Sequence, residues 1–143
     1  MIVEIEVCTK IDDEVVNAFA RLVPQLSKTS EPPGQNHLEE IISHCACSVL
    51  LARVEEKIVG SLTLAIFPLP TGKRAWIEDV VVDESARGFG VGEKLNLAAI
   101  EIANKEGART IDLTSRPSRE AANRLYKRMG FEERATNVYR YES

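Results

Sequence analysis

The sequence lacks any long apolar segment. A helix that crosses a bilayer needs about 20 consecutive apolar residues, and no run of that length occurs among the 143 residues. The first residues, MIVEIEV, carry glutamates where a signal peptide would carry basic side chains. From the sequence we therefore expect a soluble, cytoplasmic protein with no membrane partner.

Basic blocks are also missing. The chain has 18 lysines and arginines against 22 aspartates and glutamates, which gives a net charge of −4. No basic patch of the kind that binds nucleic acid is present, so no nucleic-acid partner is expected. The negative charge mildly favours a cationic substrate. A chain of this length can bury a sizeable core as one ordinary domain, which predicts a single domain over residues 1–143.

Cysteine is scarce, with only Cys8, Cys45 and Cys47. An odd number in a chain without a secretion signal indicates reduced thiols rather than a disulfide framework. A zinc site built from Cys45, Cys47, His37 and His44 is disfavoured, because Cys-x-Cys is not the usual zinc spacing and no second pair follows. The sequence predicts no metal.

What the sequence does contain is a glycine-rich turn between a strand and a helix, at residues 80–94 (VVVDESARGFGVGEK). Gly88, Gly90 and Gly92 let the backbone take positive φ or approach a ligand closely. Because the first amides of a helix have no internal partner and the helix dipole adds positive charge, such a turn suits phosphate or pyrophosphate. Arg87 adds a full positive charge. A plain turn without a ligand is the alternative for an isolated glycine triplet.

Two common phosphate motifs do not fit this turn. A P-loop needs GxxxxGK[ST], whereas Lys94 follows Gly92 by two residues and Leu95 comes next. A dinucleotide-binding fingerprint needs GxGxxG directly after its strand and an acidic residue about 20 positions later, where Asp112 lies. Glu93, however, stands where the third glycine belongs, and too few residues follow for a doubly wound sheet.

Residues 87–92 (RGFGVG) instead resemble the R/Q-x-x-G-x-G/A acyl-CoA signature of the GNAT superfamily of acyl-CoA-dependent N-acetyltransferases. Residues 76–82 (WIEDVVV) resemble that family's central splayed strand, and residues 121–131 (AANRLYKRMGF) are similar to its A-x-x-L-Y-x-x-x-G-F ending. The three elements occur in the family's order and span residues 76–133. The N-terminal half matches only in its order of elements.

The resemblance implies acetyl-CoA as co-substrate and assigns its binding residues. The loop amides would receive the pyrophosphate, and the main chain before the loop would pair with the pantetheine amides like an added strand. The main-chain N–H of Val80 or Val81 would stabilise the charge that develops on the acetyl oxygen. The implied cofactor-binding residues are Val80, Val81, Val82, Arg87, Gly88, Phe89, Gly90, Val91, Gly92, Glu93, Asn123 and Tyr126.

The resemblance also implies catalytic residues. Tyr126 shares a helix face with Asn123 and would protonate the leaving thiolate; the alternative is a partly buried aromatic with a satisfied hydroxyl. Glu78 occupies the acidic position of the family's I-E-x-L-x-V pattern and is the candidate base, with Asp79 on the opposite strand face as the alternative. In branches of the family that acetylate protein N-termini, the position of Thr114 is often a Glu. Its absence here makes an N-terminal peptide substrate less favoured.

Residue patterning predicts the element order β-α-α-β-β-β-α-β-α-β-β. The expected strands are residues 2–7, 48–54, 58–66, 76–82, 111–114, 131–134 and 138–141, and helices are expected to begin near residues 12, 36, 93 and 118. The expected fold class is α/β (α+β). It is a single-domain GNAT fold with a mixed, mostly antiparallel, twisted sheet of about seven strands and helices on both faces.

Together these features predict an acyltransferase, an acetyl-CoA-dependent N-acetyltransferase without a metal. It would act on a primary amine of a small molecule or a protein by direct attack in a ternary complex. A non-catalytic acyl-CoA-binding or sensor module is the alternative from another class, and a dinucleotide-binding domain is the third. Dimers are common in the family, so a homodimer is a further expectation.

Overall fold

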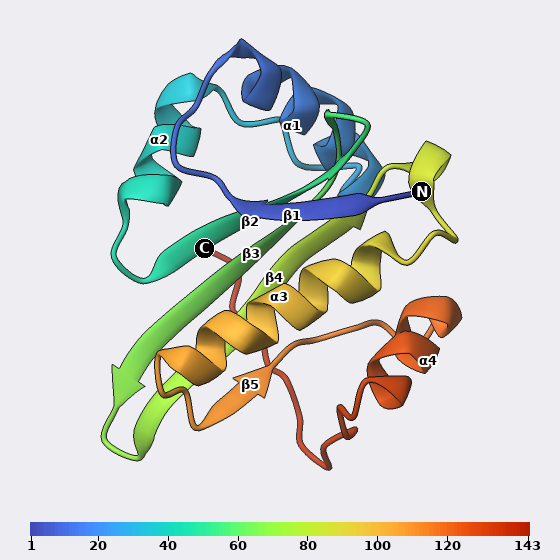
Figure 1. The fold of residues 1–143 in the computed structure, drawn as a ribbon. Coiled ribbons are helices and arrows are strands. Elements are labelled where there is room, and N and C mark those ends of the chain that lie inside the picture. Colours follow the sequence, from blue (N-terminus) through green and yellow to red (C-terminus); the bar gives the residue numbers. More distant parts are fainter.

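The computed structural model describes all residues from 1 to 143. Its centre is one twisted sheet of five strands in the order β1-β2-β3-β4-β5 (Figure 1). Neighbouring strands are antiparallel from β1 to β4, and β4 pairs with β5 in parallel. The strands are β1 (Val3–Val7), β2 (Cys47–Val54), β3 (Lys57–Leu69), β4 (Gly72–Val82) and β5 (Thr110–Asp112).

Helices cover both faces of the sheet. α1 and α2 lie on one face and α3 crosses the other, while α4 follows β5 at the edge (Figure 1). α1 starts after Asp12, whose carboxylate accepts a hydrogen bond from the Val15 amide at 3.0 Å. None of the helices combines the length and the apolar character needed to cross a membrane. The helices are α1 (Asp13–Leu26), α2 (Gln35–Ser43), the short 3-10 helix η1 (Glu84–Ala86), α3 (Val91–Lys105) and α4 (Glu120–Arg128).

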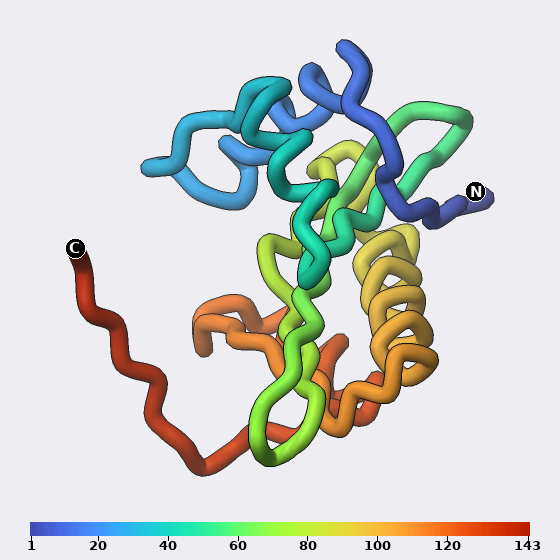
Figure 2. The backbone as a smooth tube through the Cα atoms, turned by 90° about the vertical axis from the view of Figure 1, so that its left-hand side faces the viewer, coloured from blue at the N-terminus to red at the C-terminus, as the bar shows by residue number.

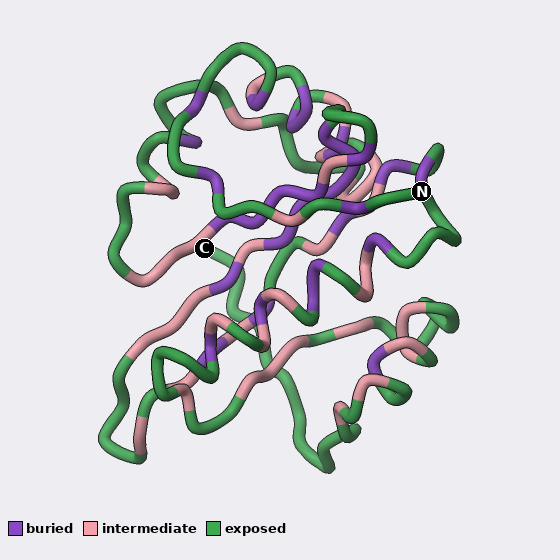
Figure 3. Tube along the Cα trace, in the orientation of Figure 1, coloured by how far each residue is buried: buried purple, intermediate pink, exposed green.

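Each face of the sheet has its own hydrophobic core. Leu50 of β2 packs in the cluster that Leu95 of α3 joins, whereas the next residue, Leu51, packs with Leu22 of α1 and Leu38 of α2. Successive side chains of a strand point to opposite faces, so one strand supplies both cores. Figure 3 shows the buried residues gathered along the central strands and the inner sides of α1 and α3.

The structure corrects the predicted number of strands, because five form rather than about seven. Residues 131–134 and 138–141, predicted as a closing pair, belong to no strand, and Val138 is 75% exposed. β-propensity is a preference for a pleated, half-buried surface, and β5 offers a neighbour only three residues long. The C-terminal segment instead passes, without pairing, on the side of the sheet that carries α1 and α2 (Figure 2).

Gly60 of β3 allows the start of α3 to close onto the sheet. A Cβ built there would lie 3.1 Å from the Val81 carbonyl oxygen and 3.2 Å from side-chain atoms of Val91 and Leu95. Contacts this short would push the helix away from the strands. The bare backbone of Gly60 thus sets the distance between the end of β4 and the first turn of α3.

Candidate active site

The loop between β4 and α3 has a left-handed backbone at two glycines. Gly88 has a φ of +85° and Gly90 a φ of +80°, a region that residues with a Cβ avoid. Gly90 is the N-cap of α3, and no side chain caps the helix there. The first amide of α3 that donates a hydrogen bond to the preceding turn is that of Lys94, which bonds to the Gly90 carbonyl oxygen at 3.1 Å. The amides of residues 91–93 therefore have no partner within the helix.

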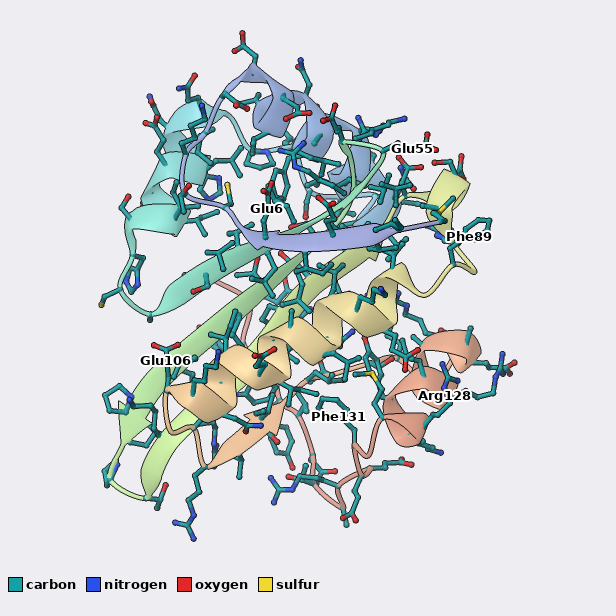
Figure 4. The ribbon with its side chains drawn as sticks, in the orientation of Figure 1. Glu6, Glu55, Phe89, Glu106, Arg128 and Phe131 are labelled. Carbon is teal, nitrogen blue, oxygen red and sulfur yellow. The ribbon has the colours of Figure 1, made fainter.

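This loop is open to solvent. Phe89 is 54% exposed and lies at the outer tip of the loop, directed away from the body of the protein (Figure 4). A Cβ placed on Gly88 or Gly90 would meet nothing within 4 Å. Arg87 donates from Nε to the Val82 carbonyl oxygen at 3.1 Å, which holds its guanidinium over the end of β4. Exposed helix N-terminal amides beside an arginine could hold an anion.

A bulge interrupts β4 just before this loop. Thr63 of β3 pairs with Glu78, but Ser61 pairs with Val81, so β4 holds one residue more than β3 over this stretch. Asp79 lies in the bulge with a φ of +50°, which is left-handed. An aspartate tolerates this conformation better than most residues do.

The bulge changes which side chains face which core. Before it, Ile77 packs under α3; after it, Val80 and Val82 pack on that side, while Val81 joins the core under α1 and α2. Simple alternation from Ile77 would have placed Val81 under α3. The bulge thus turns the main chain of residues 79–82 relative to the first half of β4.

β4 and β5 separate after a short contact. β5 pairs with β4 only from Arg74 to Trp76. From Ile77 onward, the edge of β4 that faces β5 has no neighbouring strand. Its main-chain groups can therefore pair with an added extended segment, and the end of this edge lies near the first turn of α3, since a Cβ at Gly92 would be 3.8 Å from Val82.

A pocket of about 440 Å³ lies next to this edge, on the sheet face opposite α3. Glu78 and Trp76 reach it because they alternate with Ala75 and Ile77, which pack under α3. Its volume lies in the range of small-molecule sites. The lining residues are Ala65, Phe67, Trp76, Glu78, Thr114, Val138 and Arg140.

The surroundings of Glu78 make its carboxyl less acidic than a solvated one. Partial burial, in the first place, and the neighbouring negative charge of Asp79 raise the pKa of Glu78 above its ordinary value. A carboxylate with a raised pKa is a stronger proton acceptor than a fully solvated one. Asp79, the alternative base, does not line the pocket.

Tyr126 lies on α4 with its ring buried. It is 9% exposed, and its ring meets that of Phe131 edge to face, with centroids 5.8 Å apart. Burial raises the pKa of the Tyr126 hydroxyl, and the positive charge of Arg119 opposes this shift. The hydroxyl is therefore protonated at neutral pH and can act as a donor.

α4 packs against the start of α3. A Cβ at Gly92 would be 3.8 Å from Leu125 of α4 and 3.8 Å from Val82 of β4, so these three elements meet at one point. The buried Asn96 donates to the Gly92 carbonyl oxygen at 2.8 Å and fixes this turn. Asn123 donates to the Arg116 carbonyl oxygen at 3.0 Å and ties α4 to the segment after β5.

The structure thus gathers most of the predicted residues around the first turn of α3. The loop residues, the end of β4 and α4 converge there, whereas Glu78 and Thr114 line the pocket on the sheet face opposite α3. No three or more His, Cys, Asp and Glu side chains are grouped so that they could hold a metal ion. Cys8, Cys45 and Cys47 are free thiols.

A partly buried ion pair, in which Asp83 is buried and Arg21 is 36% exposed, lies at the start of the loop and was missed by sequence reasoning. Arg21 of α1 donates from Nε to Asp83 Oδ2 at 2.9 Å, and Asp83 Oδ1 accepts from the amide and the hydroxyl of Ser85, both at 3.0 Å. Asp83 in an Asp-x-Ser turn is a local signal for a cap of η1. Its partner Arg21 lies 62 residues away and gave no signal.

Asp83→Asn is expected to lower the free energy of unfolding at pH 7 by about 1–3 kcal/mol, since it leaves Arg21 without a charged partner. The hydrogen bond from the Ser85 amide, followed by the Ser85 hydroxyl and Arg21, lowers the pKa of Asp83 against the opposing effect of burial. The ionised Asp83 therefore contributes its full stabilisation above its pKa in the unfolded chain, about 3.9. This stabilisation is lost as the pH falls through the lower pKa that Asp83 has in the folded protein. The variant should lose this acid dependence in urea titrations.

Glu101→Gln is the matched control for Asp83→Asn. Glu101 also pairs with a base, Lys105 at 3.3 Å, but its side chain is 68% exposed. Exposed pairs of this kind contribute about 0.3–0.5 kcal/mol. Equal losses of stability in the two variants at pH 7 would show that the Arg21–Asp83 pair does not hold the loop.

Comparisons with known proteins agree with this geometry. The family model described as the acetyltransferase (GNAT) family matches residues 13–131. The chain is 31% identical to a mycothiol acetyltransferase of Renibacterium salmoninarum over 84% of its length and 36% of the relative. It is 42% identical to a glucosamine 6-phosphate N-acetyltransferase of Trypanosoma brucei brucei over 52% of its length and 51% of the relative. The chain thus spans at most about half the length of these curated relatives.

A solved structure extends the comparison to the whole fold. AAC(6')-Iy, in complex with the bisubstrate analogue CoA-S-monomethyl-acetylneamine, superposes with a TM-score of 0.79 over 100% of both chains. The sequence identity is 20%. This similarity shows a shared fold, including a mixed sheet between helices.

Proposed function

The chain belongs to the acetyltransferase (GNAT) family, and from this premise we propose that it transfers an acetyl group from acetyl-CoA to a primary amine by direct attack in a ternary complex. One observation carries the proposal: the edge of β4 that is unpaired from Ile77 onward ends beside the first turn of α3, where the amides of residues 91–93 have no partner within the helix. An extended chain that ends in a diphosphate matches this arrangement, and coenzyme A has that chemistry. We take residues 1–143 as one catalytic domain.

The residues present fit acetyl-CoA. The amides from Gly88 to Glu93 would receive the pyrophosphate, because the two left-handed glycines leave the space above them open. Arg87 would add its charge at the same place. The main chain of Val80 and Val82 would pair with the pantetheine amides along the free edge of β4. Bound in this way, acetyl-CoA supplies the thioester whose acetyl group is transferred.

The chemistry needs three further roles, which three groups of the chain can fill. Glu78 would bind the acceptor ammonium and take its proton, directly or through a water, so that the amine can attack the thioester carbon. The main-chain N–H of Val80 or Val81, next to the bulge, would stabilise the negative charge that develops on the carbonyl oxygen. As the carbon–sulfur bond breaks, Tyr126 would give its proton to the leaving thiolate.

The direct test is to mix the protein with acetyl-CoA and a panel of primary amines and to record free CoA thiol. We expect amine-dependent thiol release and a product heavier by one acetyl group, with initial-rate lines that intersect when both substrates are varied. Parallel lines would contradict direct attack, because they indicate a covalent enzyme intermediate. Saturable CoA binding without thiol release with any amine would support the non-catalytic module instead, and NAD binding without CoA binding the dinucleotide domain.

A further inference from the structure

The acceptor pocket carries one charge of each sign on otherwise uncharged walls. Glu78 and Arg140 are its only ionisable lining residues, and Ala65, Phe67, Trp76, Thr114 and Val138 complete the lining. The aromatic rings of Phe67 and Trp76 can pack against a small aliphatic molecule or against its ammonium group. The pocket is therefore suited to a ligand that has an apolar body with two charged ends.

Arg140 is a cation that the protein itself does not neutralise. None of the ion pairs of the structure involves Arg140, and Glu78 is likewise unpaired. The pKa of Glu78 is raised by burial and by Asp79, with no lowering by a nearby cation. The two opposite charges of the pocket thus face it separately rather than neutralising each other.

The C-terminal segment presents Arg140 to the pocket through its extended backbone. Val138 and Arg140 line the pocket, whereas Tyr139 and Tyr141 do not, although the whole segment is exposed and Val138 itself is 75% exposed. This alternation is what an extended chain produces when one of its sides faces a surface. The segment that failed to form a strand therefore serves as one wall of the acceptor site.

We propose that the acceptor is a small molecule that carries a single ammonium group and, at its other end, an anionic group such as a carboxylate or phosphate that Arg140 binds. This inference rests on the proposed acetyl transfer. The ammonium end lies at Glu78, beside the β4 bulge where the acetyl group is delivered, and a guanidinium binds carboxylate or phosphate through paired hydrogen bonds. The same guanidinium repels an acceptor with a second cation, so polycationic amines are poor substrates.

The test compares three series of acceptors of matched chain length: ω-amino acids, n-alkylamines and α,ω-diamines. A charge-assisted hydrogen bond supports a preference of about 10-fold or more in kcat/KM for the amino acid over the alkylamine, with the diamine poorest. Arg140→Glu should reverse this order, so that the diamine becomes the best of the three. The effect should fall on KM, because Arg140 binds the non-reacting end of the acceptor.

Arg134→Glu is the control. Arg134 lies in the same exposed segment and changes the net charge equally, but it does not line the pocket, so the order of the three acceptors should stay as in the unmodified protein. Acetyl transfer with equal rates for the three series, or with diamines preferred, would overturn the inference while leaving the proposed function intact. Transfer only to peptide N-termini would also overturn it. Absence of thiol release with every acceptor would instead defeat the proposed function and the inference with it.

Discussion

Tyr126→Phe is expected to lower kcat by about 10²- to 10⁴-fold, the range for a lost general acid, while CoA affinity stays nearly unchanged. The substitution removes only the hydroxyl group. The ring keeps its edge-to-face contact with Phe131, and the structure shows no hydrogen bond from this hydroxyl to another protein group whose loss would disturb the fold. The thiolate would then have to leave without a proton from the enzyme. Steady-state rates at saturating acetyl-CoA and amine, with CoA affinity by calorimetry, measure the two quantities.

Tyr141→Phe is the matched control, because it removes the same atom from a side chain that is 93% exposed. It should leave both kcat and CoA affinity unchanged. The pH profile adds a second readout: burial raises the pKa of Tyr126, so loss of its proton should reduce the rate only above the ordinary tyrosine value of about 10. A Tyr126→Phe variant with the unmodified rate would remove this residue from the mechanism.

The parts of the fold that could be predicted from sequence are those that depend on local signals. α3 was expected from residue 93 and begins at Val91, and α4 was expected near residue 118 and begins at Glu120. Apolar residues at helical spacing and glycines at the helix ends mark such segments without reference to the rest of the chain. The left-handed glycines and the uncapped start of α3 were predictable for the same reason, since they depend on backbone conformation within a few residues; that this loop binds an anion stays a prediction.

The parts that could not be predicted depend on distant partners. The bulge at Asp79 exists because Ser61 and Thr63 of another strand pair on either side of it, and nothing adjacent to Asp79 marks the shift. Arg21 and Asp83 meet across 62 residues. The prediction of strands at residues 131–134 and 138–141 was wrong, because such a run becomes a strand only when a neighbouring strand pairs with it.

The pocket also shows why net charge is a weak guide to a substrate. An overall charge of −4 mildly favours a cationic acceptor, and Glu78 is consistent with that. Yet Arg140 lines the same pocket and takes part in none of the ion pairs of the structure, which is why we propose an anionic group at the other end of the acceptor. Interactions at contact distance outweigh the summed charge of exposed groups, which salt screens beyond about 8 Å.

Gly90→Val is expected to weaken CoA binding by about 10²- to 10⁴-fold. Valine is strongly disfavoured at the φ of +80° that Gly90 adopts, so the N-cap must leave the left-handed region and the amides of residues 91–93 turn away from the phosphates. Losing two charge-assisted hydrogen bonds at about 1.5–3 kcal/mol each accounts for that range. Titration calorimetry with CoA measures the change directly.

Gly107→Val separates loss of the site from loss of stability. Gly107 has the same φ of +80°, lies just beyond the other end of α3, and likewise has no atom within 4 Å of the place that a Cβ would occupy. Both variants should therefore unfold at similarly reduced temperatures, but only Gly90→Val should lose CoA. Gly90→Asn should retain most of the affinity, because asparagine tolerates the left-handed conformation. If Gly90→Val bound CoA as tightly as Gly107→Val does, the diphosphate would have to bind elsewhere, and the assignment of the β4 edge to pantetheine would fail with it.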